Sequence, residues 1–333
     1  MTLLVVNDLK VEFPTIDGKV KAVDGVSFSV ERGETLAIVG ESGCGKSVTN
    51  LALMGLLPRR ASRIQGSALL HCDGSEPIEL INLEEEKSRQ IRGKDISMIF
   101  QDPMSSLHPY FTIGNQLIEA HQAHNAVPKE ESRQRAIELL EKVGISESKT
   151  RINSYPHQFS GGMRQRVMIA MALINDPKLL IADEPTTALD VTVQAQILKL
   201  LSDLQDEFKM AIILITHDLG LVAGAANRVN VMYAGKIVES AQVDDLFVNP
   251  LMPYTHGLLA SIPRAGARGQ QLKVIGGQPP SLLNLPQGCS FAPRCSFTSQ
   301  VHGGADLCHS QLPNLNERNP GHLVRCHLEV GRL

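Results

Sequence analysis

A glycine-rich segment that follows a short apolar run constrains this chain more than any other feature. Residues 35–39 read TLAIV, which predicts a buried strand, and the next eight residues fit the pattern G-x-x-x-x-G-K-[ST]. The glycines let the backbone curl so that several N–H groups point at phosphate oxygens, and the following helix adds its N-terminal dipole. We expect a nucleotide phosphate site in which Lys46 reaches the β and γ phosphates and Ser47 holds Mg²⁺. The loop consists of Gly40, Glu41, Ser42, Gly43, Cys44, Gly45, Lys46 and Ser47.

Size and charge narrow the class of protein. The 333 residues exceed the usual size of one compact domain, so we expect a large core domain with an appendage. The 32 Lys and Arg residues stand against 35 Asp and Glu, and the net charge of −3 argues against a general nucleic-acid binder. No apolar run is long enough to span a bilayer, and the first residues lack a basic region followed by an apolar one. We therefore expect the protein to be made and kept in the cytoplasm.

The segments on either side of the loop differ in pattern. Residues 3–11 and 19–30 read as short antiparallel strands, whereas residues 112–177 have a helical pattern typical of a separate subdomain. Phe13 precedes the phosphate loop and could stack on an adenine ring, although aromatic residues are common in half-buried strands.

Polar side chains follow three apolar strands of the predicted sheet. Asp183 and Glu184 come directly after the run LLIA, a place where open α/β sheets bind ligands. Asp183 suits Mg²⁺ coordination, and Glu184 suits polarisation of the water that attacks a γ-phosphate. His217 follows the strand at residues 211–215 and could contact the γ-phosphate, or it could be structural. Gln101 follows the strand at residues 96–100 and could present its amide to a metal or water, or form a turn.

Two predicted helices begin with capping residues. Ser160 precedes Gly161 and Gly162 at the start of an apolar helix, and uncrowded N–H groups at such a start suit a second phosphate-contacting surface or a plain capped helix. Asp190 opens an amphipathic helix that runs to about Phe208.

In their order, these motifs resemble those of the nucleotide-binding subunit of an ATP-binding-cassette (ABC) transporter, over roughly residues 3–248. The resemblance implies an α/β fold with a mixed central sheet, an antiparallel β subdomain and a helical signature subdomain at about residues 104–177. It also implies ATP and Mg²⁺ as ligands and head-to-tail pairing of two such subunits. Residues 40–47 resemble the Walker A loop and Ser160 to Met163 the family signature, with Met163 where glutamine is common. The remaining matches are Phe13 (adenine-stacking aromatic), Gln101 (Q-loop, a Mg²⁺ contact), Asp183 and Glu184 (Walker B aspartate and catalytic glutamate), Asp190 (D-loop) and His217 (switch histidine).

Beyond residue 248 the composition shifts to Pro, Gly and Cys, so we expect an ABC domain at 1–248 and a small Cys-rich extension at 249–333. In a reducing compartment, clustered cysteines point to a metal rather than to disulfides. Four thiolates can enclose Zn²⁺ or an iron–sulfur cluster, and the lack of paired C-x2-C knuckles favours [4Fe–4S], although free thiols are also possible. We expect a cluster here to be structural, because a small extension has little hydrophobic core of its own and needs a cross-link for stability. The spacing is Cys289-x5-Cys295-x12-Cys308-x17-Cys326.

The extension, its Pro253-Tyr254-Thr255 stretch and residues 100–107 resemble the dipeptide, oligopeptide and nickel importer branch, closest to the dipeptide-type ATPase subunit. The branch implies uptake of dipeptides or short oligopeptides in preference to nickel, powered by ATP hydrolysis. It also implies a second, non-identical ATPase subunit, two transmembrane permeases and an external binding protein. The expected location is the cytoplasmic face of the inner membrane, where the subunit is peripheral. A soluble ABC ATPase without a transport role is a weaker alternative, since the chain has neither two cassettes nor a long coiled-coil insertion.

Overall fold

The computed structural model describes the chain except for residues 73, 75, 103–105, 188, 263–274 and 330–333. The first residues expected in the helical subdomain, 104 and 105, and residues 263–274 of the expected extension therefore lie outside the described residues.

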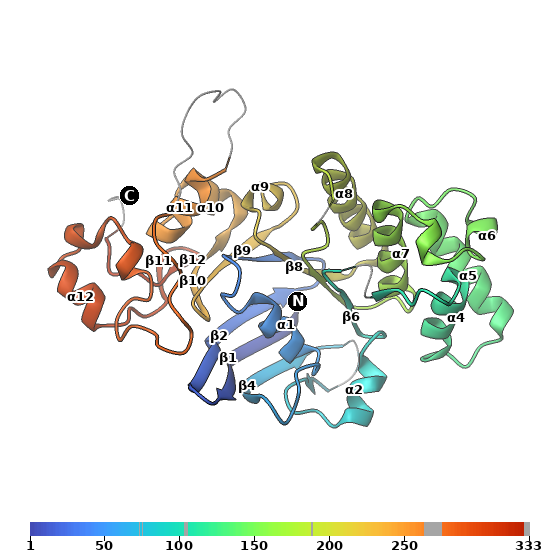
Figure 1. The fold of residues 1–333 in the computed structure, drawn as a ribbon, viewed down its shortest axis with the longest axis horizontal. Coiled ribbons are helices and arrows are strands. Elements are labelled where there is room, and N and C mark those ends of the chain that lie inside the picture. The colour runs from blue at the N-terminus through green and yellow to red at the C-terminus, as the bar shows by residue number, and fades with distance from the viewer. Residues whose placement is uncertain (73, 75, 103–105, 188, 263–274, 330–333) are drawn as a thin grey trace.

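An eight-stranded mixed sheet forms the centre of the described structure (Figure 1). Its strand order is β11-β12-β10-β9-β3-β8-β7-β6, and the pairs from β9 to β6 are parallel, whereas β9 to β11 are joined by antiparallel pairs. The predicted mixed central sheet is confirmed. The strands are β3 (Thr35–Val39), β6 (Ile96–Ile99), β7 (Leu179–Asp183), β8 (Ala211–Thr216), β9 (Arg228–Tyr233), β10 (Lys236–Gln242), β11 (Asn316–Asn319) and β12 (His322–Val324).

A second, antiparallel sheet contains the N-terminal strands in the order β2-β1-β4-β5. The long pairing of β1 with β2 includes several register shifts, which let both strands curve. The strands are β1 (Thr2–Thr15), β2 (Gly18–Glu31), β4 (Arg63–Leu70) and β5 (Ile78–Glu79).

Helices pack around the central sheet, and further segments of the chain lie beyond each of its two ends. Figure 1 shows a group of helices beyond β6 at one end and the cysteine-containing segment at the other. The group beyond β6 consists of α4 (Ile113–Gln122), α5 (Lys129–Lys142), α6 (Ser148–Arg151) and α7 (Gly161–Leu173). The other helices are α1 (Lys46–Leu53), α2 (Glu85–Ile91), α8 (Val191–Phe208), α9 (Leu219–Val222), α10 (Val243–Val248), α11 (Pro253–Ala260) and α12 (Gly304–Ser310), with 3₁₀ turns η1 (Pro156–Gln158), η2 (Ala292–Arg294) and η3 (Thr298–Gln300).

The core divides along the two faces of the central sheet. Alternate side chains of β3 point to opposite faces, so that Leu36 and Ile38 pack with α1 and the antiparallel sheet, while Ala37 and Val39 pack with β9 and α9. The second of these clusters also contains Tyr254 and Phe291. The cysteine-containing segment is therefore packed against the same core as the nucleotide-site strands, and it also contributes β11 and β12 to the central sheet.

Candidate functional site

The loop at residues 40–47 connects β3 to α1 and curls around the side chain of Lys46. The ammonium of Lys46 is buried and donates to the carbonyl oxygens of Gly40 at 2.7 Å and Glu41 at 3.0 Å. Gly45 has φ +108°, and a Cβ there would lie 2.3 Å from the carbonyl oxygen of Ala22. Only glycine fits at this position, because β2 passes directly behind the loop. The loop is thus a preformed concave turn at the start of a helix, the arrangement that suits phosphate binding.

Oxygen donors from two elements meet beside this loop. The hydroxyl of Ser47, in the first turn of α1, donates to Oδ1 of Asp183 at the end of β7, at 3.2 Å. Burial raises the pKa of the Asp183 carboxyl; the Ser47 hydrogen bond opposes that shift and the charge of Glu184 adds to it. A hydroxyl and a carboxylate are the hard oxygen ligands that Mg²⁺ prefers, so this pair of side chains fits the metal.

The carboxylate of Glu184 is the meeting point of three polar side chains. Gln101 donates from Nε2 to Oε2 at 2.9 Å, Thr187 donates to the same oxygen at 2.9 Å, and Nδ1 of His217 lies 3.1 Å from Oε1. Burial alone would raise the pKa of Glu184, but the bonds from His217 and Thr187 and the nearby positive charges outweigh it, and the net shift is downward. Glu184 also has φ +46°, a strained value for a residue other than glycine and one that is often found at functional sites.

Ser160 and Asp190 are both helix caps. The Ser160 hydroxyl accepts from the Met163 amide at 3.3 Å at the start of α7, and Asp190 accepts from the Val193 amide at 3.0 Å at the start of α8. A Cβ on Gly162 would lie 3.2 Å from Val193, whereas one on Gly161 would lie 3.8 Å from Leu189. Helix α7 packs against α4, α5 and β6, whereas α1 packs against β1 and β2. The signature segment and the phosphate loop of one chain are therefore carried by different parts of the fold.

The remaining predicted residue, Phe13, lies on β1 opposite Val20 and packs partly buried against the core. Three residues that contact Glu184 or the loop were not predicted from the sequence. Thr187 has a weak signal, since it stands three residues after Glu184. Tyr254 and Arg294, which both contact Glu41 of the loop, have no local signal at all.

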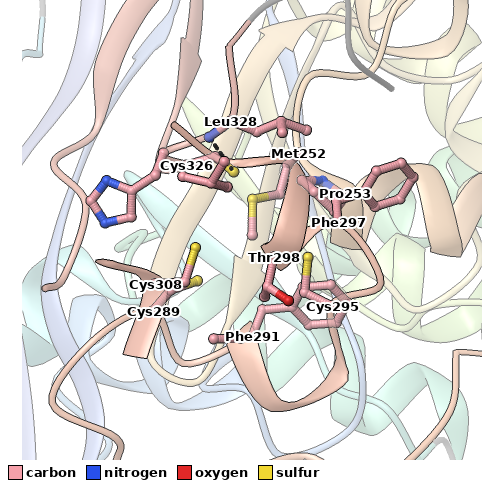
Figure 2. A pocket seen from close by; sticks show the side chains of 13 residues that line it. Met252, Pro253, Cys289, Phe291, Cys295, Phe297, Thr298, Cys308, Cys326 and Leu328 are labelled. Atoms are coloured by element: carbon pink, nitrogen blue, oxygen red, sulfur yellow. Dashed lines mark hydrogen bonds between the residues drawn. The ribbon is translucent and has the colours of Figure 1, made fainter. Parts of the chain in front are cut away.

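The four cysteines of the last part of the chain line one pocket, and Figure 2 shows their sulfur atoms facing the same space. The backbone N–H of Leu328 donates to the Cys326 sulfur at 3.4 Å, and that of Ala292 donates to the Cys289 carbonyl oxygen at 2.9 Å. Burial raises the pKa of all four thiols, to about 11 for Cys308 and about 12 for Cys326, so the thiols are protonated at neutral pH without a ligand. Among the described residues, no group of three or more His, Cys, Asp or Glu side chains is placed to hold a metal ion.

A curled phosphate loop after β3, two adjacent carboxylates at the end of β7, and a capped helix α7 that begins with two glycines are the features of the ATP-binding-cassette class. The ABC transporter family model matches residues 23–187, and the model of the oligopeptide/dipeptide transporter C-terminal region matches residues 238–301.

Relatives extend this match over nearly the whole chain. The oligopeptide transport ATP-binding protein OppD of Salmonella typhimurium is 50% identical over 99% of this chain and 95% of its own length. AppD of Bacillus subtilis, an oligopeptide transport ATP-binding protein, is 51% identical over 98% of this chain and 97% of its own length. DppD of Bacillus subtilis, a dipeptide transport ATP-binding protein, is 49% identical over 99% of this chain and 96% of its own length. The chain belongs to the ABC transporter family of ATPases, in the branch that carries the oligopeptide/dipeptide transporter C-terminal region, and both resemblances are confirmed.

Solved structures give the same fold. The dimeric ATP-binding cassette MJ0796 superposes with a TM-score of 0.62 at 27% identity, covering 72% of this chain and 99% of that one. CbiO1 of Clostridium perfringens has a TM-score of 0.62 at 29% identity, covering 74% of this chain and 91% of that one. Within the residues that the structure describes, none of the helices is long and apolar enough to cross a membrane.

Proposed function

We propose that this chain is the ATP-hydrolysing subunit of an importer for dipeptides or short oligopeptides. The observation that carries the proposal is the convergence of Gln101, Thr187 and His217 on the Glu184 carboxylate, beside a loop suited to phosphate. A carboxylate with a lowered pKa stays ionised at neutral pH and can accept a proton from an attacking water. The relatives named for oligopeptide and dipeptide transport support the cargo.

We assign the roles as follows. Residues 40–47 bind the phosphates, with Lys46 nearest the β and γ groups, and Phe13 stacks on the adenine. Ser47, Gln101 and Asp183 hold Mg²⁺, which supplies charge neutralisation on the phosphates when it is bound. Glu184 is the general base, His217 contacts the γ-phosphate, and Asp190 lies at the subunit contact. Ser160, Gly161 and Gly162 serve the ATP held by a partner subunit.

The location of Ser160 and the phosphate loop on different elements of the fold supports pairing with a second ATPase subunit. Helix α7 packs against α4, α5 and β6, whereas α1 packs against β1 and β2, and this separation supports closure of the site by the α7 of a partner. The related cassette MJ0796 forms a dimer, which supports the same arrangement. We propose a non-identical ATPase partner, two transmembrane permeases and an external substrate-binding protein, with this subunit peripheral at the cytoplasmic face of the inner membrane.

We propose that residues 249–333 form a small extension to the nucleotide-binding domain at 1–248 and hold a [4Fe–4S] cluster. Among the described residues, no group of three ligating side chains is placed to hold one metal ion; the support comes from the four cysteines that line one pocket and from the Leu328 N–H that donates to the Cys326 sulfur. Such donors stabilise thiolate ligands. When bound, the cluster would cross-link the extension and stabilise its fold. Iron and zinc analysis of anaerobically purified protein, with Cys308→Ser as the comparison, decides between the cluster, zinc and free thiols.

The decisive test of transport is ATP hydrolysis by the complete complex reconstituted in proteoliposomes. We expect dipeptides or short oligopeptides, delivered by the external binding protein, to stimulate hydrolysis several-fold. Stimulation by Ni²⁺ alone would instead identify a nickel importer. Hydrolysis that is insensitive to every solute would leave a non-transport ATPase.

A further inference from the structure

Glu41, the second residue of the phosphate loop, is fixed at three of its groups. Its carboxylate accepts from Nη1 and Nη2 of Arg294 at 2.7 and 2.9 Å. Its backbone N–H donates to the Tyr254 hydroxyl at 2.9 Å, and its carbonyl oxygen accepts from Nζ of Lys46 at 3.0 Å. Arg294 is thus connected through Glu41 to the ammonium of Lys46, the group to which we assign the β and γ phosphates.

Arg294 is itself rigidly held. Its side chain is only 5% exposed, its Nε donates to the Gly276 carbonyl at 2.9 Å, and its Nη1 donates to the Tyr233 hydroxyl at 3.3 Å. The guanidinium lies 5.8 Å from the centre of the Tyr233 ring and 5.9 Å from that of Phe291. A bidentate arginine–carboxylate pair in such surroundings fixes the orientation of the carboxylate as well as its distance from the cation, whereas a lysine would fix only the distance.

The same short segment supplies two walls of the cysteine pocket. Arg294 ends the turn η2 and directly precedes Cys295; its own N–H donates to the Phe291 carbonyl at 2.9 Å, and the N–H of Ala292 donates to the Cys289 carbonyl at 2.9 Å. The Cys289 amide also donates to the Cys308 carbonyl at 2.8 Å. A rearrangement at these thiols therefore moves the backbone that carries Arg294.

We propose that Arg294 is a positioning residue for the phosphate loop, and that through Glu41 it couples nucleotide binding to the integrity of the four-cysteine pocket. The inference rests on the proposed binding of nucleotide by residues 40–47. It does not depend on which ligand, if any, the thiols hold. Because coupling is reciprocal, nucleotide at the loop must also stabilise the segment from Cys289 to Cys295.

The first test is ATP affinity of the purified full-length subunit, measured by titration with Mg-ATP. We expect Arg294→Gln to raise Kd about tenfold, since the loop loses its preorganisation. Arg294→Lys should recover only part of the loss. Glu41→Gln removes the same ion pair from the loop side and should weaken binding similarly, and the double variant should be no worse than either single one.

Arg325→Gln is the matched control. Arg325 also precedes a cysteine, but its guanidinium donates to the carbonyl oxygens of Ile237 and Pro313, neither of which belongs to the loop. We expect ATP affinity close to that of the wild type. An equal loss in both arginine variants, additive losses in the double variant, or unchanged affinity in Arg294→Gln would each overturn the proposal.

The second test is peptide-resolved hydrogen exchange over residues 289–308, with and without Mg-ATP. We expect ATP to slow exchange there in the wild type and in Arg325→Gln, but not in Arg294→Gln. Equal protection in all three proteins would overturn the coupling. Iron content measured in the same samples tests the cluster hypothesis independently of the coupling. A wild-type protein that does not bind ATP would contradict the proposed function rather than the coupling.

Discussion

The Nδ1 atom of His217 lies 3.1 Å from Oε1 of Glu184, so the histidine at the end of β8 holds the carboxylate at the end of β7. The other carboxylate oxygen is occupied by Gln101 and Thr187. Contacts at both oxygens, together with the strained backbone of Glu184, orient the side chain before nucleotide arrives. Preorganisation of this kind is expected of a general base rather than of a solvated strand-end acid.

Replacement of Glu184 by glutamine should separate binding from hydrolysis. The amide keeps the size of the side chain but does not accept a proton, so we expect the ATPase rate of the reconstituted transporter to fall at least about 100-fold. ATP affinity should remain within a few-fold of that of the wild type. Phosphate release and nucleotide binding, measured on the same preparation, check both statements. An unchanged rate would remove Glu184 from the role of base.

Loss of His217 should shift the pH dependence of hydrolysis. The hydrogen bond and charge of His217 oppose the effect of burial and help to hold the pKa of Glu184 below its ordinary value. A base works only when ionised, so the rate falls as pH drops through this pKa. In His217→Ala the pKa rises, and we expect the acid limb of the pH–rate profile to move to higher pH.

Thr187→Val serves as the comparison for that profile, because it removes another hydrogen bond to Glu184 at nearly constant side-chain volume. Its acid limb should move in the same direction by a smaller amount. A profile in His217→Ala that keeps its wild-type acid limb would show that His217 does not set this pKa.

Much of the nucleotide site could be predicted because its parts are local in sequence. Parallel strands end at one edge of a sheet, so a motif that follows β3, β7 or β8 must lie near the others. Asp183 ends β7, while Ser47 and His217 follow β3 and β8; in the structure Ser47 contacts Asp183, and His217 contacts the adjacent Glu184.

Contacts made over long sequence distances could not be predicted in this way. Glu41 and Arg294 are 253 positions apart, and no periodicity or spacing pairs them. The same is true of Glu239 on β10, which is fully buried and bonds His322 of β12 at 2.8 Å. That pair links β12 to β10 of the central sheet, a connection that composition does not reveal.

Removal of one oxygen donor should weaken the site for Mg²⁺. Ser47 and Asp183 lie 3.2 Å apart at their oxygens, and we propose that both contribute to the same ion. In Asp183→Asn we expect the Mg²⁺ concentration for half-maximal ATPase activity to rise about tenfold or more, since a carboxylate is replaced by a neutral amide. Titration of activity with Mg²⁺ at fixed ATP measures the change. An unaltered Mg²⁺ requirement would contradict the assignment.

An ion pair between the two sheets should make stability sensitive to acid. Nζ of Lys236 lies 2.7 Å from Oδ2 of Asp24. Burial raises the pKa of Asp24, but the hydrogen bond and charge of Lys236 outweigh it, and the net shift is downward. Stabilisation from a lowered carboxyl pKa is present above the unfolded-state pKa and is lost as pH falls through the folded-state value.

Asp24→Asn should therefore lower the free energy of unfolding by about 1 kcal/mol at neutral pH and by less in acid, where the wild type has also lost the bridge. Denaturant titrations between pH 3 and 7 measure this difference. A destabilisation that is the same at every pH would show that packing, rather than the charge, accounts for the effect.

The glycines of the phosphate loop should differ sharply in their tolerance of alanine. At Gly45, with φ +108°, a Cβ would lie 2.3 Å from the Ala22 carbonyl oxygen, a backbone atom that cannot move aside cheaply. At Gly43, with φ +78°, a Cβ would meet no heavy atom within 4 Å. Gly43→Ala therefore has only the intrinsic cost of a left-handed residue, about 1 kcal/mol, whereas Gly45→Ala must also displace β2 or the loop. We expect Gly45→Ala to lower the unfolding free energy of the nucleotide-free protein by clearly more than Gly43→Ala. Equal losses would mean that the loop is not tightly packed against β2.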